Sequence, residues 1–152
     1  MILYLAVAAV ASAGAVLAVA WMRRQLRVVT IHGDSMRPTF VPGNRVLVRR
    51  VPLSRVNTGD VIVLGDPALG GLGAAAPDGR PWLIKRAIAV PGDPVPASVA
   101  PVLSVAAGSP VRDGALIALG DNPDASVDSR QFGYVLADHL LGVVLRPMTA
   151  GK

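Results

Sequence analysis

The stretch that decides the fold is residues 82–93, which read WLIKRAIAVPGD. Trp82–Val90 is apolar apart from two basic residues, and it ends at the turn signal Pro91-Gly92-Asp93, as β-strands commonly do. Similar short runs bounded by Gly, Pro, Asn and Asp recur along the chain, whereas residues 23–152 contain no long apolar pattern with helical period. We therefore expect a mainly β domain, a compact antiparallel sheet or barrel-like structure, with further strands at Arg27–Ile31, Arg45–Val51, Asp60–Leu64, Ala115–Leu119 and Gly142–Arg146.

Two stretches lack any strand pattern. Gly65–Pro81 is rich in Gly, Ala and Pro, and Asp93–Pro110 is rich in Pro. Such compositions are typical of connections. We expect a loose hairpin or loop in the first and mostly irregular chain in the second.

The N-terminal segment has a different character. Residues 2–22, ILYLAVAAVASAGAVLAVAWM, contain no charge and end at Arg23-Arg24. A helix of about 20 apolar residues spans a bilayer core. Ala11-Ser12-Ala13 resembles the cleavage site of a secretory signal peptide, but there is no basic region before it and the apolar run continues past it. We therefore expect one uncleaved transmembrane helix at 2–22, followed by a single domain at 23–152.

The charges that flank this segment bear on its orientation. Arg23, Arg24 and Arg27 all follow the span, and only the α-amino group precedes it. The positive-inside rule on its own would therefore place the following domain in the cytoplasm.

Composition excludes several chemistries. The chain has 152 residues with no Cys, two His and 10 acidic residues, all of which are Asp. There is thus no disulfide, no cysteine nucleophile and no H-E-x-x-H metalloprotease motif. A zinc site built from two histidines without Cys or Glu is improbable, so we expect neither metal nor cofactor.

The chain is basic, with a net charge of +5, and Arg45, Arg49, Arg50 and Arg55 cluster in the sequence. Residues 45–49 largely alternate between basic and apolar, which is typical of a half-exposed strand, and no aromatic residues accompany them. Nucleic-acid binding is therefore not expected. A solvated strand face near anionic lipid head groups is the preferred interpretation.

Candidate bases are few. His32 and His139 lie in no recognisable triad motif, and His139 is expected at the entry to the last strand. Lys85 is more informative, because alternation on a strand would place it on the apolar face of Leu83, Ala87 and Ala89. Burial lowers a lysine pKa and leaves an amine that can act as a general base. A lysine that extends from a strand edge to water is the alternative, and the pattern alone favours it.

Ser35 is the candidate nucleophile. It lies in residues 33–39, GDSMRPT, which alone is ordinary turn chemistry. A nucleophilic serine also requires a nearby base.

Taken together, separated segments resemble, in order, the motifs of bacterial type I signal peptidases, the Ser-Lys membrane proteases of the S26 type. The nucleophile motif S-M-x-P-T is matched at 35–39, and a structural strand at 59–63. The general-base motif K-R-x-x-x-x-P-G-D is matched at 85–93. The motif G-D-N-x-x-x-S-x-D-S-R is matched at 120–130. With the N-terminal span, the resemblance covers nearly the whole chain.

The resemblance implies that Ser35 is the nucleophile, that Lys85 is the general base and that the Ser126 hydroxyl orients the lysine amine. Charged side chains match pairs that brace such a site, Asp128 with Arg130 and Arg86 with Asp121. Met36 is expected to pack beneath the nucleophile or to border the substrate cleft.

The chain also departs from the family pattern. Gly33 stands where some members have a hydroxyl that stabilises the oxyanion, so the Ser35 backbone N–H is expected to carry that role. Asn44 replaces a usual Asp, and Pro123 replaces a common Arg. The short chain between the last two motifs implies that the large accessory domain of some relatives is absent. With Pro123, the last motif resembles that of nickel superoxide dismutase maturation proteases.

The function implied is a serine endopeptidase that removes signal peptides from exported preproteins, with small residues such as Ala before the cut. It would be a single-pass protein of the cell membrane, with its partners being preproteins and the bilayer. Its catalytic domain would be extracytoplasmic, against the charge rule. A dedicated maturation protease is one alternative, and a catalytically silent membrane-anchored binding protein is another. A LexA-like autoprotease is disfavoured by the span, and the sequence specifies no oligomeric state.

Overall fold

The computed structural model describes residues 25–65, 74–75 and 81–148, together with residues 14 and 16. The expected transmembrane helix at 2–22 lies outside the described residues except at those two positions. Within the described part of the chain, no helix has both the length and the apolar character needed to cross a membrane. Most of the expected connection Gly65–Pro81 also lies outside the described residues.

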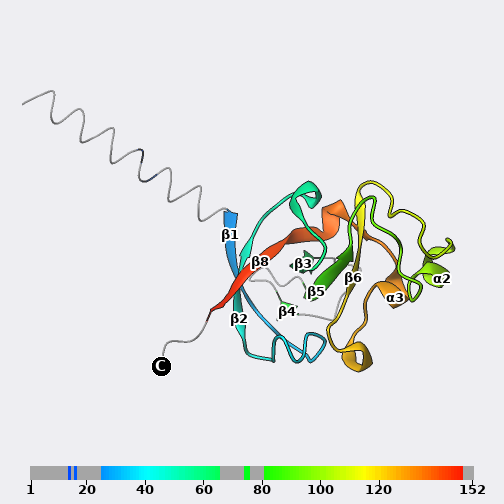
Figure 1. Ribbon diagram of the computed structural model, residues 1–152. Coiled ribbons are helices and arrows are strands. Elements are labelled where there is room, and N and C mark those ends of the chain that lie inside the picture. The colour runs from blue at the N-terminus through cyan, green and yellow to red at the C-terminus, as the bar shows by residue number, and fades with distance from the viewer. Residues whose placement is uncertain (1–13, 15, 17–24, 66–73, 76–80, 149–152) are drawn as a thin grey trace, which may run out of the picture.

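The described chain forms one eight-stranded antiparallel sheet, in the order β1-β2-β8-β3-β5-β6-β7 with β4 paired to β5. The sheet curls into a half-barrel (Figure 1). The mainly β prediction is confirmed, and every predicted strand is present. The strands are β1 (Leu26–Thr30), β2 (Arg45–Arg49), β3 (Val61–Gly65), β4 (Ala74–Ala75), β5 (Pro81–Ala89), β6 (Ala115–Leu119), β7 (Val135–Leu136) and β8 (Leu140–Met148).

Local differences from the predictions are small. β2 ends at Arg49 rather than at Val51. His139 ends a 3-10 turn directly before β8, at the entry to the last strand as predicted. The expected irregular stretch Asp93–Pro110 contains one short helix. The helices are α2 (Ala100–Leu103) and α3 (Ser129–Phe132), and the 3-10 turns are η1 (Leu53–Arg55), η3 (Pro123–Ala125) and η4 (Ala137–His139).

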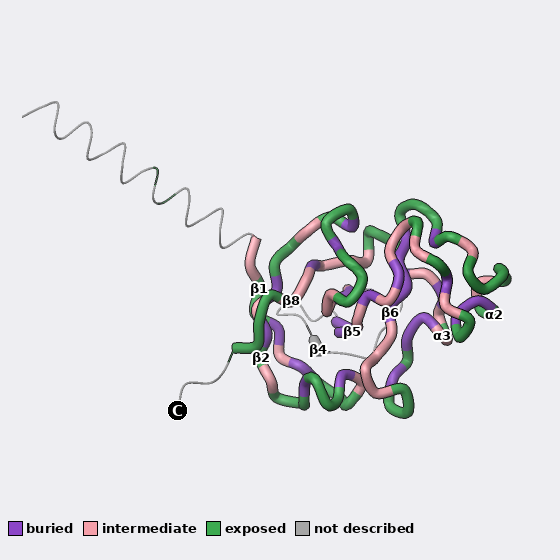
Figure 2. Tube along the Cα trace, in the orientation of Figure 1, coloured by how far each residue is buried: buried purple, intermediate pink, exposed green. Residues whose placement is uncertain are grey.

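β5 lies between β3 and β6 and is the most buried long strand (Figure 2). Its residues alternate between two apolar clusters, because successive side chains point to opposite faces. Ile84 joins the cluster that contains Val63, whereas Leu83 joins the cluster that contains Ile62. Apolar residues on both faces of a strand are what a strand buried on both sides requires.

The turn Pro91-Gly92-Asp93 follows β5 as the sequence predicts. Gly92 has φ of +90°, a conformation that favours glycine. The Asp93 carboxylate accepts hydrogen bonds from the Thr58 hydroxyl and from the Val90 N–H. This turn therefore joins the loop before β3 to the end of β5.

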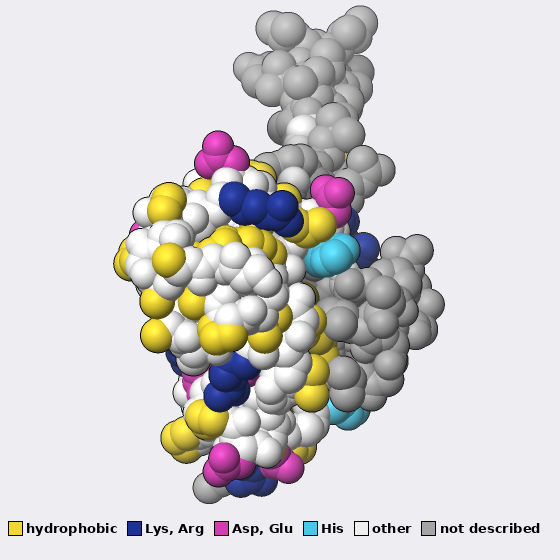
Figure 3. Space-filling view, turned by 90° about the vertical axis from the view of Figure 1, so that its right-hand side faces the viewer, with side chains coloured by type: hydrophobic (Ala, Val, Ile, Leu, Met, Phe, Trp, Pro, Cys, Tyr) yellow, Lys and Arg dark blue, Asp and Glu magenta, His cyan; other side chains and the backbone are white. Residues whose placement is uncertain are grey.

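Charged side chains are dispersed on the face shown in Figure 3. Basic groups lie apart from one another there, with acidic and apolar side chains between them. That face does not present the continuous basic stripe typical of nucleic-acid-binding proteins.

Candidate active site

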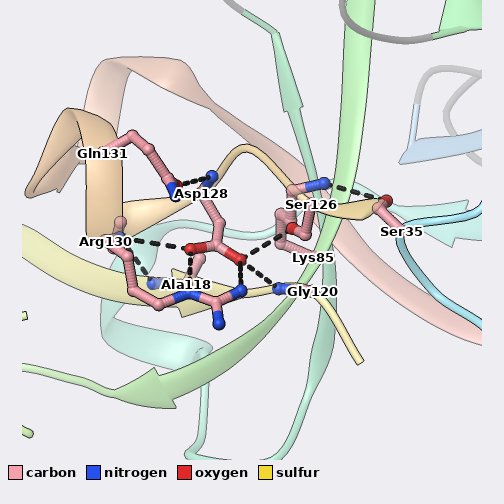
Figure 4. A network of polar contacts seen from close by, with 9 residues as sticks. Ser35, Lys85, Ala118, Gly120, Ser126, Asp128, Arg130 and Gln131 are labelled. Atoms are coloured by element: carbon pink, nitrogen blue, oxygen red, sulfur yellow. Dashed lines mark hydrogen bonds and ion pairs between the residues drawn. The ribbon is translucent and has the colours of Figure 1, made fainter. Parts of the chain in front are cut away.

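Ser35 and Lys85 meet although 50 positions separate them in the sequence. The Lys85 Nζ donates a hydrogen bond of 2.9 Å to the Ser35 Oγ (Figure 4). Ser35 comes from the loop between β1 and β2, and Lys85 from the middle of β5. A hydroxyl and an amine are thus held within proton-transfer distance of each other.

Lys85 is buried, with 2% of its surface exposed. The alternative favoured by the pattern alone, a lysine that reaches water from a strand edge, is therefore wrong. Lys85 is paired with Ile62 of β3, and the ladder between β5 and β6 begins at the next residue, Arg86, so the lysine lies inside the sheet. Burial lowers the pKa of Lys85 from 10.5 to about 8, while the Asp128 charge raises it and the Arg130 charge lowers it. A substantial fraction of the amine is consequently neutral in mildly alkaline solution.

The loop that carries Ser35 is anchored on both sides. Gly33 has φ of +76°, which lets the chain turn sharply before the serine. Met36 is 1% exposed and packs into the core beside Val29 and Ile31. The Met36 carbonyl accepts a hydrogen bond of 2.9 Å from the Phe40 N–H, which closes the loop.

Asp128 lies at the centre of a second polar network (Figure 4). The side chain has no exposed surface, yet Arg130 binds both of its oxygens, at 2.9 Å through Nε and at 2.7 Å through Nη2. The Gly120 N–H and the Ser126 hydroxyl donate to the same carboxylate, at 2.9 and 2.7 Å. Burial opposes the charge of Asp128, but these donors outweigh it and lower its pKa to about 2.

Asp128 also begins α3. It forms a capping box with Gln131, in which each side chain bonds the backbone of the other end of the turn. The neighbouring Ser129 hydroxyl accepts a hydrogen bond from the Ala118 N–H. The 126–131 segment is thereby fixed against the end of β6.

Ser126 belongs to this network rather than to the lysine. Its hydroxyl donates to Asp128, and in the described part of the chain no hydrogen bond joins Ser126 to Lys85. Gly120 shows how closely Ser126 approaches the loop that carries Ser35. A Cβ at Gly120 would lie 2.2 Å from the Ser126 Oγ and 2.6 Å from the Ser35 carbonyl oxygen. Only glycine fits where these two segments meet.

Arg86, next to Lys85 on β5, points to the other face, as alternation predicts. It forms a two-pronged ion pair with Asp121, with contacts of 2.8 and 2.6 Å. The side-chain hydrogen bond from Arg86 lowers the pKa of Asp121, against the opposing effect of its burial. Arg86 also donates to the Gly59 carbonyl at 2.9 Å. Arg86 therefore joins β5 to the segment that contains Gly59 and to the segment that contains Asp121.

A cavity of about 110 Å³ opens beside the serine and the lysine. Its small volume suits a small side chain, since one water occupies roughly 30 Å³ in the liquid. It is lined by His32, Gly33, Asp34, Ser35, Lys85, Ala125 and Val127. A wider cleft of about 520 Å³ lies near Thr58 and Asp93. The polar side chains of these two residues are already bonded to each other, because the Thr58 hydroxyl donates to the Asp93 carboxylate.

Two residues of this site carry no role predicted from the sequence. Asn122 donates to the loop that carries Ser35 through its backbone and its side chain. Gly120 provides the close approach described above. Both belong to the G-D-N segment that opens the last motif of the family resemblance, and this motif is the sequence signal that points to them. Among the predicted bases that were not favoured, His32 is exposed at the cavity, and no described hydrogen bond joins it to Ser35.

Comparison with known proteins gives one family. A family model described as "Signal peptidase, peptidase S26" matches residues 2–106 and 96–149. Together these ranges cover nearly all of the chain. No curated protein matches it significantly.

Proposed function

Because the chain belongs to the signal peptidase S26 family, we propose that it is a membrane-anchored serine endopeptidase that removes signal peptides from exported preproteins. Membership of that family implies serine-type peptidase activity. In this proposal Ser35 is the nucleophile and Lys85 the general base. The observation that carries it is the 2.9 Å contact between the Lys85 Nζ and the Ser35 Oγ, made by a lysine with 2% exposure.

The reaction is an acyl transfer. Neutral Lys85 takes the proton of the Ser35 hydroxyl while the Oγ attacks the scissile carbonyl, and the carbonyl electron pair moves to its oxygen. The resulting oxyanion is stabilised by the Ser35 N–H. As the C–N bond breaks, protonated Lys85 gives its proton to the leaving amine. Lys85 then takes a proton from water while the water oxygen attacks the acyl carbonyl. As the bond between that carbon and the Ser35 Oγ breaks, protonated Lys85 returns the proton to the Oγ, which restores the free enzyme.

A lowered lysine pKa suits this cycle. A base is most effective when its pKa is close to the working pH, because it is then both substantially neutral and able to hold a proton. Burial lowers the pKa of Lys85 to about 8, whereas an exposed lysine would be almost wholly charged at that pH. The same separation serves both states, since the charged amine donates to the Ser35 Oγ and the neutral amine accepts from it.

The proposed substrate has small residues before the cleaved bond. The cavity beside Ser35 measures about 110 Å³ and is lined by small side chains such as Ala125, which supports Ala rather than a large residue in the substrate. The substrate segment would be extended, so that alternate side chains enter pockets.

The proposed location is the cell membrane, with residues 2–22 as a single span and the catalytic domain outside the cytoplasm. The reason is chemical: an exported preprotein exposes its cleavage site only after translocation. Arg23 and Arg24 favour the reverse orientation, so the proposal requires that the positive-inside rule be overridden here. A reporter fused after Lys152 that is active only in the cytoplasm would contradict this placement.

A dedicated maturation protease, similar to the nickel superoxide dismutase type, remains the second candidate. Pro123, in place of the common Arg, is the observation that favours it. A catalytically silent binding protein is disfavoured by the lysine-serine contact, which binding alone does not require.

The test uses the full chain in detergent with a panel of preproteins. Ser35→Ala and Lys85→Arg should each lower the rate by roughly 10³-fold or more, since arginine keeps the charge but cannot become a neutral base. Arg55→Lys, which alters an exposed arginine of η1, is the control and should retain most activity. Full activity in Lys85→Arg would refute the mechanism, and cleavage of a single preprotein would favour the dedicated protease.

A further inference from the structure

Asn122 holds the loop that carries Ser35 at two consecutive carbonyls. Its backbone N–H donates to the Ser35 carbonyl at 2.9 Å, and its side-chain Nδ2 donates to the Asp34 carbonyl at 3.1 Å. These contacts join segments that lie 88 positions apart, as measured between Asn122 and Asp34. Because both donors come from one residue, the Asp34–Ser35 segment is fixed in rotation as well as in position.

The Asp34 carbonyl and the Ser35 N–H are the two ends of one planar peptide group. In a trans peptide they point in opposite directions, so a donor that fixes the carbonyl also fixes where the N–H points. The Arg37 N–H donates to the same carbonyl at 3.1 Å. Within the described residues, no hydrogen bond uses the Ser35 N–H, which leaves it available to a ligand.

Two features make the direction of this N–H important. Residue 33 is glycine, so it supplies no hydroxyl as a second donor beside Ser35. Hydrogen bonds to the carbonyl end of a peptide also polarise it and strengthen its N–H as a donor. Asn122 therefore acts on the one group that the acyl transfer needs for its developing negative charge.

We propose that Asn122 is a positioning residue, whose side-chain bond to the Asp34 carbonyl aims the Ser35 N–H at the oxyanion of the tetrahedral intermediate. The inference rests on the proposed function, since it assigns Asn122 a role in that same reaction. It differs from a purely structural role in one respect. A loop-stabilising bond affects folding and substrate binding, whereas an oxyanion-aiming bond affects the transition state.

The experiment compares Asn122→Ala and Asn122→Asp with wild type in the full chain. Asn122→Ala removes only the side-chain bond, because the backbone N–H remains. Asn122→Asp keeps the side-chain size but replaces the donor with an acceptor. Asn44→Ala is the matched control, since the Asn44 side chain accepts a loop hydrogen bond of the same 3.1 Å from the Val41 N–H.

The readouts are kcat, KM, the thermal midpoint and the inhibition constant of a peptide aldehyde with the sequence of the best-cleaved preprotein. The aldehyde forms a tetrahedral adduct with Ser35 and so reports on the oxyanion site without turnover. Both Asn122 variants should lower kcat roughly 10- to 100-fold, somewhat less than deleting an oxyanion donor outright. The aldehyde constant should rise by the same factor, while KM and the acid limb of the pH profile stay at wild-type values.

Asn44→Ala should leave kcat within about twofold of wild type and shift the thermal midpoint as much as Asn122→Ala does. Wild-type kcat and aldehyde binding in both Asn122 variants would overturn the inference, as would a loss of kcat matched by an equal change in KM or by a larger drop in midpoint than in the control. Each of these results presupposes that Ser35→Ala is inactive. Full activity in Ser35→Ala would instead refute the proposed function itself.

Discussion

Lys85 and Asp128 are both buried ionisable side chains in neighbouring parts of one site, yet their surroundings favour opposite charge states. The pKa of Lys85 falls to about 8, toward the neutral form, and the pKa of Asp128 falls to about 2, away from it. The hydrogen bond of Lys85 goes to a single hydroxyl. Asp128 is surrounded by a guanidinium, a hydroxyl and backbone donors.

The contrast teaches that burial alone does not decide the state of an ionisable group. Desolvation penalises the charged form of both residues. The partners of Asp128 outweigh this penalty, whereas the Asp128 charge offsets it only in part for Lys85. A compensated charge acts as a fixed part of the scaffold. An amine whose desolvation is not fully offset gives up its proton easily, which is the property that a general base needs.

The largest expected effect comes from removing the compensated charge. Asp128→Asn should reduce the free energy of unfolding by about 3 kcal/mol, because it leaves Arg130 partly buried without its charged partner. Urea unfolding measures this, with the exposed Asp113→Asn as control, for which a change within about 0.5 kcal/mol is expected. A loss below about 1 kcal/mol in Asp128→Asn would mean that the network does not hold the 126–131 segment.

Replacing Lys85, whose charge is not fully compensated, should change the free energy of unfolding in the opposite direction. Lys85→Met should raise the free energy of unfolding at pH 7 by about 3 kcal/mol while it abolishes activity. The lysine pKa is about 8 when folded and 10.5 when unfolded, and each unit corresponds to roughly 1.4 kcal/mol.

The sign of this effect gives a second check. A base with a lowered folded pKa destabilises the protein below pH 8, and this cost fades as the pH rises to 10.5. Chemical unfolding of Lys85→Met and wild type at both ends of that range should therefore show a gap that closes at alkaline pH. A variant that is less stable than wild type at pH 7 would contradict the comparison.

The smallest expected effect appears in acid. The folded pKa of Asp128 is about 2 against 3.8 in the unfolded chain, so its stabilisation is complete above pH 3.8 and is lost as the pH falls through 2. Wild type should lose about 1 kcal/mol more than Asp128→Asn across this interval, a value that allows for solvent screening at the partly exposed Arg130. Acid titrations of the two proteins that run parallel would show that the carboxylate is not held in its charged form.

Much of the fold follows from local sequence signals. Short apolar runs separated by Gly, Pro and Asn predict every long strand, because turn chemistry and strand preference are both local. β7 escapes prediction because Val135–Leu136 is only a fragment of a pattern. β2 ends at Arg49 rather than at the predicted Val51, because its pairing with β1 and its pairing with β8 both stop at Arg49.

The burial of Lys85 could not be predicted in the same way. Alternation places it on an apolar face, but only the strand order shows whether β5 is an edge or a central strand. That order is set by distant pairings, since β8 inserts between β2 and β3. Asn122 was missed for a similar reason. Its role depends on a meeting with Asp34 and Ser35 that no local pattern encodes, although the segment containing it was recognised as part of a motif.

The most direct test of the central claim is an NMR titration of the lysine side chains. The chain contains only Lys85 and Lys152, so selective lysine labelling gives two signals, and Lys85→Met assigns them. The signal that Lys85→Met removes should titrate near pH 8, the pKa to which burial lowers Lys85, whereas an ordinary lysine titrates near about 10.4. Two signals that both titrate near 10.4 would show that Lys85 is an ordinary charged lysine, and the account of a neutral base for Ser35 would be wrong.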